Sequence, residues 1–287
     1  MGIKALLKSY NCPYGQKEWL KIMANELVML KLGGSLITDK SKLETLRKDD
    51  LARLAKEIHE AKVQGKFKLI VGHGGGSFPH RPAHEYGTAQ GFTGRESARG
   101  VALVGDAAAR LNRLVVKALI NAEENAVSFQ PSAFMVSKKG DIEDGFSKPI
   151  EIALDMGILP VPYGDICFDT AQGCAIISTE KIIDFLSSKF PAKRIVIAGI
   201  EDGVWEDFPK NSKLVEEITP KNFEKVKASL SGSADIDVTG GMLSKVEQML
   251  ELAMDTGTQT IIVNGKVSGR VRDALLGKKV RGTVIRA

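Results

Sequence analysis

The chain has 287 residues, of which 43% are hydrophobic and 26% are charged, so it can bury a sizeable core. Its net charge of +5 suits anionic substrates, but no Lys/Arg run or mixture of basic and aromatic residues indicates a nucleic-acid-binding protein. The three cysteines include no CxxC pair. This argues for a reducing compartment, and against a disulfide framework or a structural zinc site.

Residues 1–25 are interpreted as a leader before the first strand. Their apolar runs are too short for a signal peptide or a membrane span. The initial Met-Gly is only a weak match to a myristoylation signal, and Met23 is an alternative start. With no targeting signal and unpaired cysteines, we expect a cytoplasmic protein.

The first predicted strand runs from about Leu27 to Leu32 and ends in Gly-Gly. Apolar spacing predicts a helix over Lys48–Gly65, a second strand in "FKLIVG" and a long helix over Arg95–Ala122. Further strands are expected in "ILPVPYGDI", "RIVIAGI" and "TQTIIVNG", and helices in "TPKNFEKVKASL" and "GMLSKVEQMLELAMDTG". This alternation predicts an α/β sandwich with a largely parallel sheet, and no linker divides it.

Three glycine loops follow one design, in which an extended segment leads into glycines and then a polar residue. They are "KLGGS" (Lys31–Ser35), "GHGGGS" (Gly72–Ser77) and "DVTGGMLSK" (Asp237–Lys245). Glycine lets backbone N–H groups approach a ligand, and successive N–H groups bind anions. The loops therefore predict a phosphate site, although no P-loop, Rossmann fingerprint or protein-kinase signature is present.

Three lysines accompany these loops. Lys31 lies at the carboxyl end of a strand, where α/β proteins bind ligands, and a buried lysine there needs an anionic partner. Lys245 lies about one turn into a predicted helix, from which its ammonium can reach a phosphate at the helix start. Lys40 lies in a loop, where a lysine is most simply a solvated charge.

The histidines allow two readings. His80 and His84 are four residues apart, as in a metal pair, but Pro82 lies between them and no HExxH pattern is present. No metal ligand is therefore assigned. His80 follows the second glycine loop, where it could donate to a bound phosphate, and His73 is interpreted as structural.

Several segments together resemble the amino acid kinase superfamily, and more narrowly the archaeal-type isopentenyl phosphate kinases. These segments are "MLKLGGSLITDK", "GHGGGSFPH", "VPYGDI", "DVTGGMLSKVE" and the terminal "GTVI". The resemblance runs from about Leu27 to the C-terminus. It implies a three-layer αβα sandwich around an open, mainly parallel sheet. It also implies a kinase domain over 26–287, with an acceptor lobe at about 26–165 and a nucleotide lobe at about 166–287.

The resemblance further implies transfer of the ATP γ-phosphoryl group to isopentenyl phosphate in isoprenoid biosynthesis, with Mg²⁺ as cofactor and a homodimer as the expected assembly. Catalytic roles fall on Lys31, Lys40 and His80. ATP contacts fall on Lys31, Gly33, Gly34, Ser35, Gly75, Glu180, Asp202, Gly241 and Lys245. Substrate contacts fall on Gly74, Gly75, His80, Gly164 and Asp165.

Two departures from the family pattern bear on these roles. Pro79 stands where the family usually has glycine before the acceptor histidine, and proline fixes φ and removes an N–H donor. Thr179 and Glu180 stand where the family typically has Gly-Asp, so the acid is retained but is one methylene longer.

Two other readings remain open. A fosfomycin-type phosphonate kinase would use the same machinery on a short polar acceptor, and would require a closed polar pocket. A non-catalytic ligand-binding member of the fold would not require Lys31, Lys40, His80 and Lys245 together.

Overall fold

The computed structural model describes residues 26–230 and 241–287, and the predicted leader lies outside this range. The helices are α3 (Gly34–Ile37), α4 (Lys48–Gly65), α5 (His80–Glu85), α6 (Arg95–Asn121), α7 (Lys148–Asp155), α8 (Thr179–Lys189), α9 (Phe223–Leu230), α10 (Gly241–Thr256) and α11 (Arg270–Leu275), with short 3₁₀ turns η1 (Thr88–Gln90) and η2 (Pro131–Ala133). In the described part of the chain, no helix is both long and apolar enough to span a bilayer.

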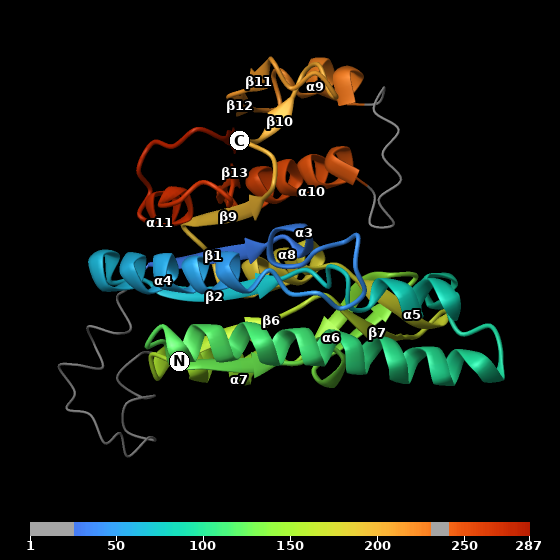
Figure 1. The fold of residues 1–287 in the computed structure, drawn as a ribbon. Coiled ribbons are helices and arrows are strands. Elements are labelled where there is room, and N and C mark those ends of the chain that lie inside the picture. The colour runs from blue at the N-terminus through green and yellow to red at the C-terminus, as the bar shows by residue number, and fades with distance from the viewer. Residues whose placement is uncertain (1–25, 231–240) are drawn as a thin grey trace, which may run out of the picture.

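A mainly parallel sheet forms the centre of the molecule (Figure 1). Its order is β12 (Glu217–Ile218), β14 (Thr283–Ile285), β13 (Gln259–Asn264), β9 (Arg194–Gly199), β1 (Leu27–Leu32) and β2 (Lys68–His73). Among the described strands of this sheet, β13 and β14 form the one antiparallel pair. A parallel bridge between His73 and Tyr163 connects β2 to β6 (Leu159–Pro162), which pairs in parallel with β3 (Ala126–Phe129).

Further, smaller sheets accompany the central sheet. A four-stranded sheet contains β5 (Asp141–Gly145), β4 (Met135–Lys138), β7 (Asp165–Asp169) and β8 (Gly173–Ile177) in that order. The short strands β10 (Val204–Trp205) and β11 (Leu214–Val215) form a separate antiparallel pair. The small sheet adjoins the carboxyl end of β6, because β7 begins immediately after the turn that follows β6.

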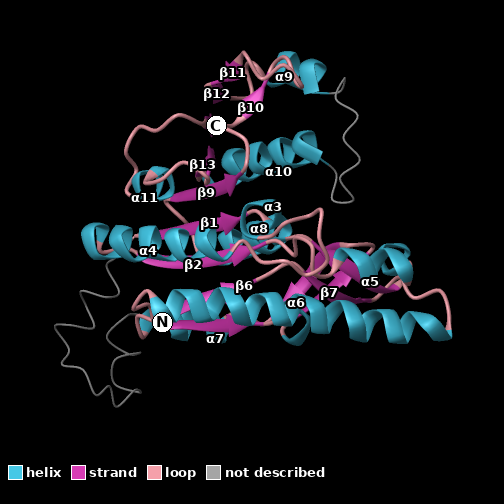
Figure 2. Cartoon of the chain, in the orientation of Figure 1, coloured by secondary structure: helices cyan, strands magenta, loops and turns pink. Residues whose placement is uncertain are grey.

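Helices cover both faces of the central sheet, as Figure 2 shows. The residues of β1 alternate between the two faces because the side-chain period of a strand is two. Val28, Leu30 and Leu32 enter the core that α4, α6 and α11 cover. Leu27 and Met29 enter the opposite core, with side chains from α7, α8 and α10. This confirms the predicted three-layer αβα sandwich, and the alternation places Lys31 on the α8 side.

Most predicted elements form where the periodicity placed them. The first strand and the Lys48–Gly65 helix have the predicted bounds, and the long helix ends one residue early, at Asn121. The segment "ILPVPYGDI" differs, because it contains all of one short strand, β6, then a turn at Tyr163–Gly164 and the start of another strand, β7. The lobe boundary near 165 stays a prediction.

Candidate active site

The two glycine loops after β1 and β2 form one continuous backbone surface. The strands are parallel and adjacent, so both loops leave the sheet at its carboxyl edge. The amide of Gly74 donates to the Leu32 carbonyl at 2.9 Å. A Cβ atom on Gly34 would lie 2.4 Å from the amide nitrogen of Gly76, so only glycine permits this contact. Gly33, Gly34, Gly74 and Gly75, which were predicted separately, therefore share one site, together with Ser35 on α3.

Thr38 joins these loops and was not identified from the sequence. Its buried hydroxyl donates to the Gly34 carbonyl at 2.7 Å and accepts from the Ser77 amide at 2.9 Å. One side chain thus holds the first loop against the second. Thr38 belongs to the "ITDK" motif that carried the resemblance, but its role needs the contact between loops 39 residues apart.

Lys31 meets Glu180 in a buried ion pair. The Nζ–Oε1 distance is 2.7 Å, and the two side chains are 10% and 7% exposed. Glu180 lies in the first turn of α8, where the Ser178 hydroxyl accepts from the Lys181 amide and caps the helix. Burial would raise the pKa of Glu180, but the charges of Lys31 and Lys245 outweigh this and hold that pKa below its ordinary range. The Glu180 carboxylate therefore stays charged at neutral pH.

Lys245 approaches the same pair from another element. It lies in the first turns of α10, which begins at Gly241 with a left-handed φ of +67°. Its charge acts on Glu180, so the described structure brings Lys31, Glu180 and Lys245 together from β1, α8 and α10. The rest of the third glycine loop, residues 231–240, lies outside the described residues.

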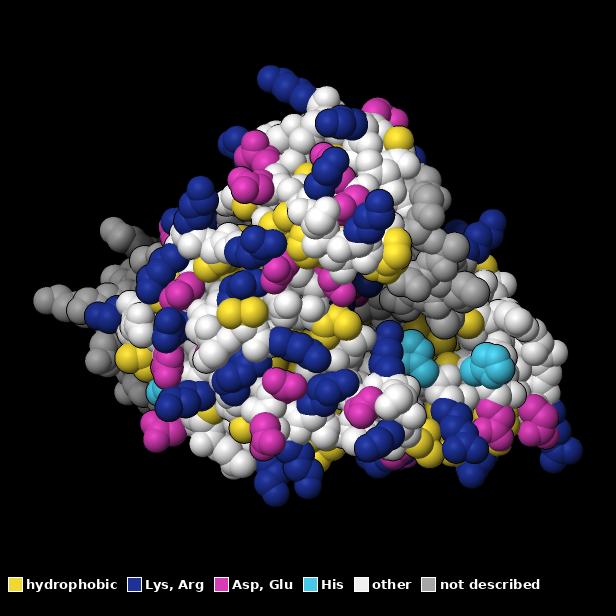
Figure 3. Space-filling model, turned by 45° about the horizontal axis from the view of Figure 1, so that its top comes forward, with side chains coloured by type: hydrophobic (Ala, Val, Ile, Leu, Met, Phe, Trp, Pro, Cys, Tyr) yellow, Lys and Arg dark blue, Asp and Glu magenta, His cyan; other side chains and the backbone are white. Residues whose placement is uncertain are grey.

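A cavity of about 290 Å³ opens beside the glycine loops and contains both Lys40 and His80. Its other lining residues are Ser41, Lys42, Leu43, Gly76, Ser77 and Arg81. This lining contains two lysines, one arginine, one histidine and no carboxylate, which is the composition of an anion site. Figure 3 shows histidine side chains beside Lys and Arg side chains on one face of the molecule. Lys42 and Arg81 were not identified, because each is an ordinary exposed cation in the sequence.

Pro79 fits its position without strain. Its φ is −81°, within the range that the proline ring imposes, and its carbonyl accepts from the Ala83 amide as α5 begins. The ring packs against Gly75, where an added Cβ would lie 2.3 Å from the Pro79 Cγ. Proline therefore stiffens the step from the glycine loop to His80, the first residue of α5.

The Gly164–Asp165 turn lies against the second glycine loop. The Gly164 amide donates to the His73 carbonyl at 3.0 Å. The buried Asp165 carboxylate accepts from the Ser132 hydroxyl at 2.8 Å and from the Ile166 amide at 2.8 Å. Burial raises its pKa despite these hydrogen bonds. The carboxylate shapes the turn, and its contact with substrate stays a prediction.

Asp202 follows β9, and β9 lies against the first glycine loop, because the Gly33 amide donates to the Ala198 carbonyl at 2.8 Å. Its carboxylate pairs with Arg270 and, at 2.8 Å, with Arg281. Burial would raise the pKa of Asp202, but both guanidinium groups hold it below its ordinary range. Its assigned ATP contact stays a prediction.

Comparison with known proteins places the chain in a family. Residues 26–264 match the model of the amino acid kinase family. The chain is 35% identical to the isopentenyl phosphate kinase of Methanothermobacter thermautotrophicus and 35% identical to that of Methanocaldococcus jannaschii, each alignment covering 90% of this chain and 98% of the relative. A solved isopentenyl phosphate kinase structure superposes with a TM-score of 0.77 at 33% identity, over 90% of this chain and 99% of that one. The chain therefore belongs to the amino acid kinase family, and within it to the isopentenyl phosphate kinases.

Proposed function

We propose that this chain transfers the γ-phosphoryl group of ATP to isopentenyl phosphate and releases isopentenyl diphosphate and ADP. The observation that supports this proposal is the cationic cavity that contains Lys40 and His80 and is lined by Gly76 of the second glycine loop. The Lys31–Glu180 pair lies at the end of β1, where the first glycine loop begins. Such an arrangement suits two phosphate groups that must approach each other. The family relatives carry the same activity in their names.

The chemistry needs little from a general base. An acceptor monophosphate is mostly dianionic at neutral pH, because its second pKa is about 6. An oxygen of the acceptor phosphate attacks the γ-phosphorus of ATP. The bond between the γ-phosphorus and the oxygen that bridges it to the β-phosphorus breaks, and ADP leaves with the electron pair of that bond. Lys31 and Lys40 neutralise the transferring group, Lys245 holds the ATP phosphates, and His80 donates to the acceptor phosphate. Catalysis then rests on positioning and electrostatics.

We infer that Mg²⁺ enters as the ATP complex. Mg²⁺ is commonly bound by substrate phosphates and waters with few protein carboxylates. No cluster of three or more His, Cys, Asp or Glu side chains suited to a metal occurs within 26–230 and 241–287. When bound, the cation would neutralise phosphate charge.

The isoprenoid tail has an apolar neighbour close to His80. Helix α5 carries Ala83 one turn after His80, and Ala83 packs on a small cluster of Val104, Ile166 and Cys174. We propose that the tail runs from the phosphate cavity toward this cluster, between α5, α6 and β7. The apolar residues of α6 then divide between two clusters, because Leu111 and Val115 belong to the main core instead.

We also propose a cytoplasmic homodimer. Exposed apolar side chains support the dimer, with Leu114 and Ile120 on α6 and Val127 on the neighbouring strand β3. Light scattering of the purified protein tests it, and a single monomeric mass at micromolar concentration would contradict it.

The activity is tested by ADP release from Mg-ATP with isopentenyl phosphate, dimethylallyl phosphate or fosfomycin as acceptor. We expect turnover with the two prenyl phosphates. Turnover with fosfomycin alone would instead support the phosphonate kinase, and ATP binding without turnover on any acceptor would support a binding protein.

A further inference from the structure

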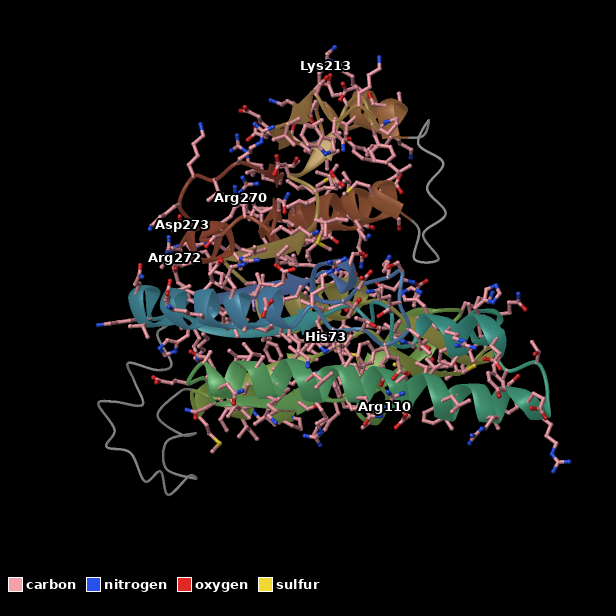
Figure 4. All side chains as sticks on the ribbon, viewed as in Figure 1. His73, Arg110, Lys213, Arg270, Arg272 and Asp273 are labelled. Atoms are coloured by element: carbon pink, nitrogen blue, oxygen red, sulfur yellow. The ribbon has the colours of Figure 1, made fainter. Side chains whose placement is uncertain are left out.

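His73, the last residue of β2, lies buried where several segments of the candidate site meet. Figure 4 shows it between β2 and α6. Its Nδ1 atom lies 3.1 Å from the Gly74 carbonyl oxygen, and its Nε2 atom lies 3.1 Å from the Asn112 amide nitrogen. Its ring stacks on Tyr163 with a centroid distance of 5.6 Å and an angle of 10°.

The neighbours of the ring determine its tautomer. The Asn112 side-chain nitrogen also contacts the Val161 carbonyl at 3.2 Å, so this atom must be the donating NH₂ group. Nε2 of His73 therefore accepts, and Nδ1 carries the proton that it donates to the Gly74 carbonyl. Burial lowers the pKa of His73 to about 4, so the ring stays neutral at physiological pH.

The His73 backbone joins two more segments. Its carbonyl accepts from the Gly164 amide at 3.0 Å and from the Thr179 hydroxyl at 2.7 Å. Gly164 belongs to the turn after β6, and Thr179 directly precedes Glu180, the partner of Lys31. The glycine loop, the Gly164–Asp165 turn and the start of α8 thus all take their position from one residue.

We propose that His73 is a positioning residue, whose Nδ1–H group holds the Gly74 carbonyl and thereby sets the phosphate-binding loop for transfer. This inference rests on the proposed kinase function. Two neighbours support His73. Asn112 donates to Nε2 and so fixes the tautomer of the ring, and the Thr179 hydroxyl donates to the His73 carbonyl and so fixes its backbone. The plain alternative is that His73 only fills space in the core.

Three substitutions separate these two roles. In His73→Asn, the amide nitrogen can occupy the Nδ1 position and donate to Gly74, although the smaller side chain leaves a cavity and the Asn112 NH₂ group loses one of its two acceptors. His73→Gln places a polar atom near the Nε2 position and loses the bond to Gly74. His73→Phe keeps the ring and its stack on Tyr163 but loses both hydrogen bonds.

We expect His73→Gln and His73→Phe to lower kcat about tenfold with KM values within about threefold of wild type, since one positioning hydrogen bond is lost. We expect His73→Asn to keep kcat within about twofold while having the lowest Tm of the three. If kcat instead falls in the same order as Tm across the three variants, so that His73→Asn is the least active, His73 is only a core residue and the inference is wrong.

Hydrogen–deuterium exchange provides a readout that needs no substrate. The peptide containing Gly74–Gly76 should exchange faster in His73→Gln and His73→Phe than in wild type, and at the wild-type rate in His73→Asn. A peptide from α4 serves as the internal control. If the wild-type protein lacks kinase activity and the four proteins still show this exchange pattern, the proposed function is overturned and the positioning role is retained. Equal exchange in all four proteins would overturn the positioning role itself.

Discussion

Lys31 and Lys40 lie on the same chain segment but in opposite electrostatic surroundings. Lys31 is buried at the end of β1 and pairs with Glu180 at 2.7 Å. Lys40 is exposed and lines a cavity that contains other cations and no carboxylate. A buried charge requires a partner to remain in the fold, whereas an open cluster of cations is stabilised by water until an anion arrives. Lys31 is therefore held in place by Glu180, whereas Lys40 is open to bind an anionic ligand.

The largest expected effect comes from breaking the buried pair. Lys31→Met should lower kcat/KM about 10³-fold, because it removes a charge aimed at the transferring group. It should also destabilise the fold by about 3–5 kcal/mol, because Glu180 is left buried and unpaired by Lys31. Steady-state ADP release and urea unfolding measure the two effects.

The matched variant is Lys31→Met combined with Glu180→Gln. It should recover most of the stability but none of the activity. A double variant as unstable as Lys31→Met, or a Lys31→Met enzyme with near-normal kcat/KM, would show that the pair does not have the role assigned to it.

The open cavity is tested by His80→Ala. We expect KM for the acceptor to rise about 30-fold while KM for ATP changes less than about twofold, because a charge-assisted hydrogen bond to the acceptor phosphate is lost. His84→Ala, one helical turn away on the exposed surface of α5, is the control. If both KM values stay at the wild-type level in His80→Ala, its assignment to the acceptor phosphate is wrong.

The buried Lys31–Glu180 pair should make the stability of the fold depend on pH in acid. The folded-state pKa of Glu180 is lowered, so its contribution is complete above the ordinary carboxyl pKa near 4.5 and is lost as the pH falls through the lower folded value. Because one carboxyl group titrates, the equilibrium constant for unfolding changes by at most about tenfold per pH unit. Wild type should lose stability more steeply below pH 5 than the Lys31→Met/Glu180→Gln variant, and parallel curves would contradict this.

Arg81 is a second test of the open cavity, because the structure places it in the lining and the sequence alone did not identify it. Arg81→Gln should raise KM for the acceptor about three- to fivefold, a small effect because the side chain is exposed and its charge is screened. The effect should shrink as salt increases from 50 to 500 mM. Arg95→Gln, an exposed arginine at the start of α6, is the control and should leave KM unchanged.

The smallest effect is expected from Pro79→Gly. Because φ at this position already suits proline, glycine should lower stability by about 0.4–1 kcal/mol through the unfolded chain and change kcat less than about twofold. Pro191→Gly, in a loop away from the cavity, is the comparison variant. A large gain in kcat for Pro79→Gly would mean that the proline aims His80 wrongly for this acceptor.

The sequence by itself determined the layered fold, the glycine loops and the family. These depend on local patterns, because the strand and helix periods and glycine's backbone freedom are written within a few consecutive residues. The "KLGGS", "GHGGGS" and "GGMLSK" segments were recognised for this reason, and they identified Lys31, His80 and Lys245 as residues of one site.

Only the tertiary structure decided which side chains meet. The Lys31–Glu180 pair joins residues 149 positions apart, and Thr38 and Asn112 reach across from other elements to the glycine loop and to His73. Lys42 and Arg81 are ordinary surface cations until the two loops bring them to one cavity. Such contacts depend on packing between distant segments, and no local period encodes them.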